Sequence, residues 1–254
     1  MSPPKSELSA ELELRTHLAY LNLPFIREQF EDLAKQAAEK QWGPVDYLRR
    51  LIEGEAVQRQ DRAQQRRIQQ ARFPVVKTLE QFNFTWPQKI NRLQVQQFFR
   101  LKFIEEQLNL LFIGGVGLGK SHLAIALGYA ACLAGHHVLF ATAVDVINNL
   151  AAAQKAGRFG SELNKYLRPD VLILDELGYL PIDKHGADLL FQIISKRYER
   201  GPIILTSNKA FKHWTSIFNN DATLTAALLD RLLHHAETVV IEGKSYRMKD
   251  RIEP

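Results

Sequence analysis

Residues 114–121 constrain the fold more strongly than any other part of the chain. They read Gly-Gly-Val-Gly-Leu-Gly-Lys-Ser and match the phosphate-binding pattern G-x-x-x-x-G-K-[ST]. An apolar run at 110–113 precedes the loop, and a helical pattern from Ser121 to Ala134 follows it. At ordinary glycine usage, a chance match in a chain of this length is roughly a one-in-a-hundred event. The strand–loop–helix context therefore predicts an α/β fold with a P-loop.

Each residue type in this loop has a chemical reason. Glycines let backbone N–H groups curl around a triphosphate without Cβ clashes, and the helix N-terminus adds its dipole. We expect Lys120 to bind the β- and γ-phosphates and the hydroxyl of Ser121 to ligate Mg²⁺. The residues expected to bind ATP are Gly115, Val116, Gly117, Leu118, Gly119, Lys120, Ser121 and His122.

A second apolar run, at 171–174, ends in two acidic residues, Asp175 and Glu176. Ligands of open α/β sheets bind at the carboxyl ends of the strands, so both acids are expected beside the P-loop. Asp175 is predicted to hold the magnesium, and Glu176 to polarise a water for attack on the γ-phosphate. A water-activating glutamate would be a liability in a small-molecule kinase. The pair therefore favours an ATP hydrolase.

A third run, at 203–206, leads into polar residues at the same predicted edge. A polar side chain there would lie between the P-loop and the acidic strand, where it could orient the attacking water. We choose Asn208 for this role, with Thr206 as the second candidate. A polar strand end with no catalytic role is about as compatible with the sequence.

Short apolar runs alternate with helical patterns over the last two thirds of the chain, which predicts a parallel sheet with helices on both faces. Residues 8–68 show helical spacing broken at Pro24 and at Gly43-Pro44, and predict a small all-helical domain. We therefore divide the chain into domains at 1–70 and 71–254. An amphipathic helix is predicted at 88–107. The five predicted strands are at 110–113, 138–142, 171–174, 203–206 and 239–241.

Several further motifs together resemble a known family, the IstB-type transposition helper ATPases. These proteins are grouped with the DnaC-type helicase loaders in the initiator branch of the AAA+ ATPases. The resemblance covers the chain from residue 73 onward. The motifs that carry it are the P-loop, 175–181 (Asp-Glu-Leu-Gly-Tyr-Leu-Pro), Arg197-Tyr198-Glu199, Thr206-Ser207-Asn208, Leu229-Asp230-Arg231-Leu232 and Ser245-Tyr246-Arg247.

The resemblance implies an AAA+ ATPase that binds DNA, forms ATP-dependent homo-oligomers with sites at subunit junctions, and partners a cognate transposase. It implies that Asn208 is the sensor-one residue and that Arg231 is an arginine finger that reaches a neighbour's γ-phosphate. The chain departs from a complete AAA+ module because residues 208–254 leave little room for a helical lid, so we expect the lid to be truncated or absent. Arg247 could still serve as the second sensor and contact the nucleotide.

The chain has a net charge of +5, which permits contact with nucleic acid without demanding it. Two basic sets are candidates for DNA contact, and a merely soluble basic surface is the alternative for each. Neither set has the interleaved aromatic residues typical of single-strand binding, so we expect contact with duplex backbone. The sets are Arg59, Arg62 and Arg66, and Lys155, Arg158, Lys165 and Arg168.

The single cysteine, Cys132, cannot form an internal disulfide, which fits a reducing compartment. The first residues lack the apolar core of a signal peptide, and the uncharged stretch at 123–144 is divided by Gly135-His136-His137. We expect no membrane association and a bacterial cytoplasmic location. The function predicted is an ATP-dependent helper ATPase that assembles on duplex target DNA and recruits or stimulates a transposase. The alternatives are a replicative helicase loader and an ATP-binding structural switch with negligible hydrolysis.

Overall fold

The computed structural model describes residues 5–251 and divides into two compact units, with the division between Arg66 and Arg67. This division falls within one helix, α3 (Pro44–Ala71). The sequence placed the domain boundary in the same helix, at about residue 70.

The first unit is helical, as the sequence predicted. It contains α1 (Lys5–Tyr20), α2 (Pro24–Glu39) and most of α3. The prolines lie at the starts of α2 and α3, where no helical N–H is lost. A small core forms around Leu18, Ile26 and Leu51.

One polar residue of the first unit is buried. The carboxylate of Glu55 accepts a hydrogen bond from the backbone N–H of Ile26 over 3.2 Å. The neighbouring Gly54 lies against Phe25, and an added Cβ at Gly54 would be 2.0 Å from that ring. Close packing of α2 on α3 therefore explains a glycine inside a long helix.

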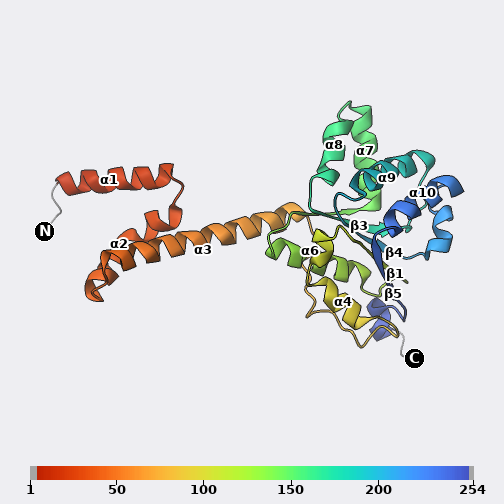
Figure 1. Ribbon diagram of the computed structural model, residues 1–254, viewed down its shortest axis with the longest axis horizontal. Coiled ribbons are helices and arrows are strands. Elements are labelled where there is room, and N and C mark those ends of the chain that lie inside the picture. Colours follow the sequence, from red (N-terminus) through yellow and green to blue (C-terminus); the bar gives the residue numbers. More distant parts are fainter. Residues whose placement is uncertain (1–4, 252–254) are drawn as a thin grey trace. The chain divides into compact units, whose positions relative to one another are not determined.

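The second unit contains a five-stranded sheet in the order β2-β3-β4-β1-β5 (Figure 1). All the neighbouring strands are parallel, which confirms the predicted fold class. The observed strands extend some of the predicted ones by a few residues. They are β1 (Asn109–Gly114), β2 (Val138–Thr142), β3 (Val171–Leu177), β4 (Ile203–Ser207) and β5 (Ala236–Ile241).

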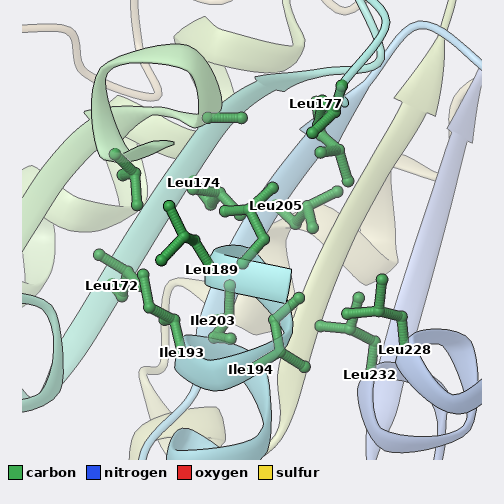
Figure 2. Close-up of a cluster of buried hydrophobic side chains, with 14 of the residues drawn as sticks. Leu172, Leu174, Leu177, Leu189, Ile193, Ile194, Ile203, Leu205, Leu228 and Leu232 are labelled. Atoms are coloured by element: carbon green, nitrogen blue, oxygen red, sulfur yellow. The ribbon is translucent and has the colours of Figure 1, made fainter. Parts of the chain in front are cut away.

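Helices cover both faces of this sheet. Successive residues of a strand point to opposite sides, so a strand made only of apolar residues presents an apolar surface on each face that a helix must bury. On one face, Leu172 and Leu174 of β3 pack in a core with α7 (Ala143–Lys155), α8 (Phe159–Leu167), α9 (Lys184–Arg197) and α10 (Ala222–Leu233). Figure 2 shows Leu189, Ile193 and Ile194 of α9 in this cluster, against side chains of β3 and β4. On the other face, Val171 and Ile173 pack in a core with α4 (Arg92–Phe98), α5 (Lys102–Glu105) and α6 (Lys120–Leu133).

Two local predictions need correction. The single helix predicted at 88–107 is two helices, α4 and α5, because Leu101 between them has φ 59° in the left-handed region. Strand β3 does not end at Leu174 but continues to Leu177 through an irregularity in its pairing with β4.

The segment after β4 is short, as expected. It forms the 3₁₀ helix η1 (Phe211–Ser216), α10, β5 and the 3₁₀ helix η2 (Tyr246–Arg251). Among the described residues, η2 is the only helix that follows β5. Over the described residues, none of the helices combines the length and the apolar character needed to cross a bilayer.

Candidate functional site

The P-loop joins β1 to α6 and adopts a backbone that needs glycine. Gly117 and Gly119 have φ of 74° and 87°, in the left-handed region that other residues rarely adopt. Gly114 lies so close to β5 that an added Cβ would be 2.2 Å from the carbonyl oxygen of Ile241. The sequence pattern therefore reflects both backbone conformation and tight packing under the loop.

Lys120 opens α6 and is almost completely buried. Its Nζ donates a hydrogen bond to the carbonyl oxygen of Gly115 over 2.7 Å. Burial lowers the pKa of Lys120 below its ordinary value, and the charge of Arg247 adds to this, whereas Asp175 and Glu176 act in the opposite direction. The ammonium therefore lies in a site that additional anionic oxygens would stabilise.

Ser121 and Asp175 meet at the carboxyl edge of the sheet. The Ser121 hydroxyl donates a hydrogen bond to Oδ1 of Asp175 over 2.9 Å. Asp175 is buried, and the same Oδ1 accepts a second, short hydrogen bond from the hydroxyl of Thr206 on β4. A hydroxyl and a carboxylate oxygen side by side are ligands of the type that Mg²⁺ takes, so the residues present fit that ion.

Glu176 has a different environment from the acid beside it. Its φ is 61°, and its side chain is exposed where the pairing of β3 with β4 is irregular. The backbone N–H of Glu176 donates to the hydroxyl of Thr206 over 3.0 Å. A glutamate held in the left-handed region is uncommon, and such backbone conformations concentrate at functional sites. One carboxylate is thus buried in a hydrogen-bond network, whereas the next remains open to a ligand.

Asn208 follows β4 and is half-buried. Its Oδ1 is buried and finds no hydrogen-bond partner among the residues that the structure describes. This oxygen lies near Gly178, where an added Cβ would be 3.4 Å from it. An unsatisfied buried amide oxygen is unusual and fits a group whose partner is a water or a ligand. Thr206, the second candidate for this role, uses its hydroxyl to hold Asp175 and Glu176 instead.

A cavity of about 540 Å³ lies over the P-loop. The C-terminal segment forms part of its wall, since the backbone N–H of Tyr246 donates to the carbonyl oxygen of Gly117 over 2.9 Å. Arg247 lines the cavity, as do Asp175 and Glu176. The other predicted residues that line it are Gly117, Leu118, Gly119, Lys120, Ser121 and His122.

Some residues of this cavity were missed by sequence reasoning. Phe82 and Trp86 belong to the segment between α3 and α4, in which no site residue was expected, yet both line the cavity. The Trp86 ring meets Tyr246 edge to face at 5.3 Å, and its Nε1 donates to the carbonyl oxygen of Lys244 over 2.9 Å. The sequence did contain an indication of this role: three of the five residues at 82–86 are aromatic, which is more than an exposed connecting segment usually has.

Two predicted ATP-binding positions have particular surroundings. The His122 ring pairs through Nε2 with the carbonyl oxygen of Thr78 over 2.9 Å and meets the Phe82 ring edge to face. Burial lowers the pKa of His122 below its ordinary value, and Lys77 acts in the same direction, although the Thr78 carbonyl opposes them. The Val116 side chain is half exposed and is not among the residues that line the cavity.

A second cavity, of about 1270 Å³, lies beside β2, and Asp175 and Glu176 also line it. The acidic strand end therefore faces two cavities. Arg72, Lys165 and Arg168 line the second one and give it a basic rim.

Arg231 lies elsewhere. It borders a small cavity together with Asn109 and Ile203, the first residues of β1 and β4. The P-loop follows the other end of β1, about 17 Å away at the usual rise per residue. Arg231 Nη1 donates to the carbonyl oxygen of Ala227 over 2.9 Å, and its guanidinium lies 4.9 Å from the centre of the Phe191 ring. The structure therefore does not bring Arg231 to the P-loop of its own chain.

The two basic sets are exposed and lie apart from the P-loop cavity. Arg59, Arg62 and Arg66 follow one another on α3 of the first unit, and Arg59 donates to the carbonyl oxygen of Asn22 over 3.0 Å. The second set lies on and around α8 of the second unit, where Lys165 pairs closely with Glu162. Its members are Lys155, Arg158, Lys165 and Arg168.

Comparison with known proteins identifies relatives over almost the whole chain. The family profile described as IstB-like ATP binding protein matches residues 16–254. The ATP-binding protein of insertion sequence IS21 from Pseudomonas aeruginosa is 42% identical over 239 residues, which cover 94% of this chain and 90% of that protein.

Solved structures resemble the second unit. The DnaC helicase loader superposes with a TM-score of 0.50 at 25% identity, over 59% of this chain and 87% of that one. The replication initiator DnaA bound to AMPPCP and single-stranded DNA superposes with a TM-score of 0.52 at 27% identity, over 66% of this chain and 50% of that one. The second unit thus has the fold of an AAA+ P-loop ATPase, and the chain belongs to the IstB-like ATP-binding protein family of insertion sequences.

Proposed function

We propose that this AAA+ ATPase assembles on duplex target DNA in the bacterial cytoplasm and recruits or stimulates the transposase of its insertion sequence. The observation that carries the proposal is the arrangement at the end of β3, where buried Asp175 is bonded to Ser121 and exposed Glu176 lies beside it. This arrangement supports hydrolysis and not merely binding of ATP. The similarity to the ATP-binding protein of insertion sequence IS21 supports a role in transposition.

Nucleotide binding would use the loop amides and Lys120. The Lys120 ammonium now donates to the carbonyl oxygen of Gly115, and we propose that it turns from this oxygen to the β- and γ-phosphates. Because burial disfavours its charged form, the phosphate oxygens would restore the stabilisation that water normally supplies. Arg247 borders the same cavity and would add a second cation to the triphosphate.

Hydrolysis would depend on Ser121 and on the ends of β3 and β4 beside the loop. Ser121 and Asp175 would hold Mg²⁺, which when bound would supply charge neutralisation for the phosphate oxygens. Glu176 would accept a proton from the attacking water, and its exposed carboxylate leaves room for that water. Asn208 would orient the same water through its amide, whose buried oxygen has no partner in the described part of the chain.

A homo-oligomer with shared sites is supported by the position of Arg231. This arginine borders the amino ends of β1 and β4, whereas the P-loop lies at the carboxyl end of β1. We propose that Arg231 stabilises transition-state charge at a neighbouring subunit, because a guanidinium offers several donors to the equatorial oxygens.

Contact with DNA is supported by the two exposed basic sets and by the net charge of +5. We propose that they bind duplex phosphates, with little reading of base sequence. A structural relative, the replication initiator DnaA, is bound to single-stranded DNA, which supports contact of this fold with nucleic acid.

A helicase loader is the second candidate, because the second unit resembles DnaC. That likeness covers 59% of this chain, whereas the IS21 relative covers 94% of it, including the helical first unit. A transposition helper is therefore the better supported function.

The test combines hydrolysis with partner capture. Steady-state ATP hydrolysis should rise when duplex DNA is added, and the nucleotide-bound protein should capture the transposase encoded beside it. Capture of a hexameric replicative helicase instead would support the loader. Negligible hydrolysis under every condition would support a structural switch and contradict the proposal.

A further inference from the structure

A cluster of metal-binding side chains lies away from the P-loop, at the junction of α10 and β5. His234 is the C-cap of α10, His235 follows it, and Glu199 lies in the turn between α9 and β4. One ligand atom from each of the three lies within 4.8 Å of the others. From this geometry we propose that His234, His235 and Glu199 bind a transition-metal ion of the Zn²⁺ class.

The spacing suits a tetrahedral ion. Two ligands at about 2.1 Å from Zn²⁺ lie about 3.4 Å apart in a tetrahedral site. His235 Nε2 and Glu199 Oε1 are 3.6 Å apart, and the two imidazole rings are 4.3 Å apart between centres. All three side chains are exposed, so the ion can enter and a water can complete the fourth position.

The hydroxyl of Tyr198 pairs with His234 Nδ1 over 2.8 Å. In the proposed site, Nδ1–H would donate to the tyrosine oxygen and Nε2 would be the ring nitrogen that binds the metal. Metal-binding histidines commonly have such a partner on the second nitrogen, because it fixes the ring and raises the basicity of the ligand. Tyr198 is therefore a positioning residue of this site.

The backbone around the three donors is held on both sides. The backbone N–H of Asn109 donates to the carbonyl oxygen of His235 over 2.8 Å, where β1 and β5 begin. In the turn of Glu199, the buried guanidinium of Arg197 donates to the carbonyl oxygen of Pro202 over 3.1 Å. The donors therefore come from two ordered segments, which limits the entropy lost on binding.

The donor types select the class of ion. Two imidazoles and one carboxylate suit Zn²⁺, Co²⁺ or Ni²⁺, whereas Mg²⁺ prefers oxygen ligands alone. The site also lies at the amino ends of the strands, opposite the Ser121–Asp175 pair. Its metal would thus be a second ion, separate from the nucleotide site. Glu199 and His235 line the same small cavity as Arg231, so the ion would lie near that arginine.

The chain contains a matched control. His136 and His137 are also adjacent histidines beside an acid, Asp170, with His136 Nδ1 at 3.8 Å from its carboxylate. That carboxylate instead accepts from the backbone N–H of His137 over 2.8 Å. Among the described residues, these three do not meet the spacing of the first cluster.

The experiment is a Co²⁺ titration of the full chain, free of affinity tag, nucleotide and magnesium, followed by visible absorption and then by displacement with Zn²⁺. We expect one equivalent per chain and the absorption of a four-coordinate ion. Tyr198→Phe, which removes the hydrogen-bond partner of a ligand, should weaken Co²⁺ binding roughly 10-fold. His234→Ala/His235→Ala removes two ligands and should weaken binding by more than roughly 100-fold. His136→Ala/His137→Ala should bind like the wild type.

The melting temperature of each metal-free variant shows whether it is folded, and the exposed histidine substitutions should leave it unchanged. Equal Co²⁺ affinity in the wild type and the His234→Ala/His235→Ala variant would overturn the proposal. An equal loss in the His136→Ala/His137→Ala variant would do the same, because it would indicate nonspecific binding by histidine pairs.

Discussion

The hydroxyl of Thr206 joins the two acids of the site, because it accepts from the backbone N–H of Glu176 over 3.0 Å and donates to the carboxylate of Asp175. The left-handed backbone of Glu176 therefore depends on a residue of the neighbouring strand. This relationship gives Thr206 a positioning role that is separate from the role proposed for Asn208.

Thr206→Val removes both hydrogen bonds while it preserves the shape of the side chain. We expect ATP affinity to change little and kcat to fall roughly 100-fold, as misplacement of a catalytic group by about 1 Å can cause. Thr206→Ser keeps the hydroxyl and should retain most of the activity. Steady-state hydrolysis at saturating ATP measures the effect, and wild-type kcat in the valine variant would contradict it.

Glu176→Gln tests the water-activating role. The amide keeps the size of the side chain but cannot accept the proton, so hydrolysis should slow by roughly 100-fold or more. Binding of ATP should persist, because Glu176 is not among the residues proposed to hold the triphosphate. Parallel measurements of nucleotide affinity and turnover separate the two steps. Turnover close to that of the wild type would remove Glu176 from the mechanism.

Arg197 has a structural role that its sequence context did not reveal. It is buried, and its guanidinium donates to the carbonyl oxygens of Tyr166, Leu167, Pro169, Asp170 and Pro202. Burial lowers its pKa to about 10, against the opposing charge of Asp170. A single planar guanidinium thus holds together the turns that precede β3 and β4.

Arg197→Lys should lower the free energy of unfolding by roughly 2–4 kcal/mol, because an ammonium cannot satisfy this set of buried carbonyls. Urea unfolding of the full chain is followed by tryptophan fluorescence, to which buried Trp214 of the same unit contributes. Arg200→Lys is the control, since Arg200 is exposed and the change should stay within about 0.5 kcal/mol. Equal stability of the two variants would contradict this prediction, because it would show that a lysine ammonium can replace the guanidinium of Arg197.

The sequence was sufficient for the parallel sheet because each central strand contains an uninterrupted apolar run, such as residues 171–174 of β3, which precede Asp175 and Glu176. The break between α4 and α5 could not be predicted, because it depends on a leucine, Leu101, in the left-handed region and not on glycine or proline. Contacts between residues far apart in the sequence also could not be predicted, because no local pattern indicates them. The contact of Tyr246 with Gly117, which brings Arg247 to the cavity, is of this kind.

Neutralising the basic set around α8 tests the proposed DNA surface. Each lost phosphate contact should reduce the slope of log affinity against log salt by about 0.9, so four contacts would reduce it by up to about 3.6. The pairing of Lys165 with Glu162 should make the observed change smaller. The variant carries Lys155→Gln, Arg158→Gln, Lys165→Gln and Arg168→Gln.

The comparison variant neutralises the α3 set, with Arg59→Gln, Arg62→Gln and Arg66→Gln. Fluorescence anisotropy on duplexes of unrelated sequence, at several salt concentrations, measures both slopes. An unchanged slope in the α8 variant with a reduced slope in the α3 variant would move the DNA surface to the first unit.

Arg231 distinguishes a self-contained ATPase from one with sites shared between subunits. Its guanidinium is held by Ala227 and Phe191 near the amino end of β1, away from the P-loop. If it completes a neighbour's site, Arg231→Ala should bind ATP normally while hydrolysis falls on the order of a thousandfold. A Lys120→Ala subunit should be inactive for the opposite reason, since it offers Arg231 but cannot bind its own ATP.

Mixing the two inactive variants therefore gives the decisive measurement. An Arg231→Ala subunit supplies a nucleotide site, and a Lys120→Ala neighbour supplies the arginine, so a mixture should recover part of the wild-type activity. Recovery should depend on total protein concentration, because the site forms only when subunits meet. A double variant that carries both substitutions in one chain is the control and should rescue neither partner beyond what simple dilution allows. Wild-type turnover that stays constant as the protein is diluted to monomer would contradict the shared site, and Arg231 would then be a charge at the end of α10 that packs on Phe191.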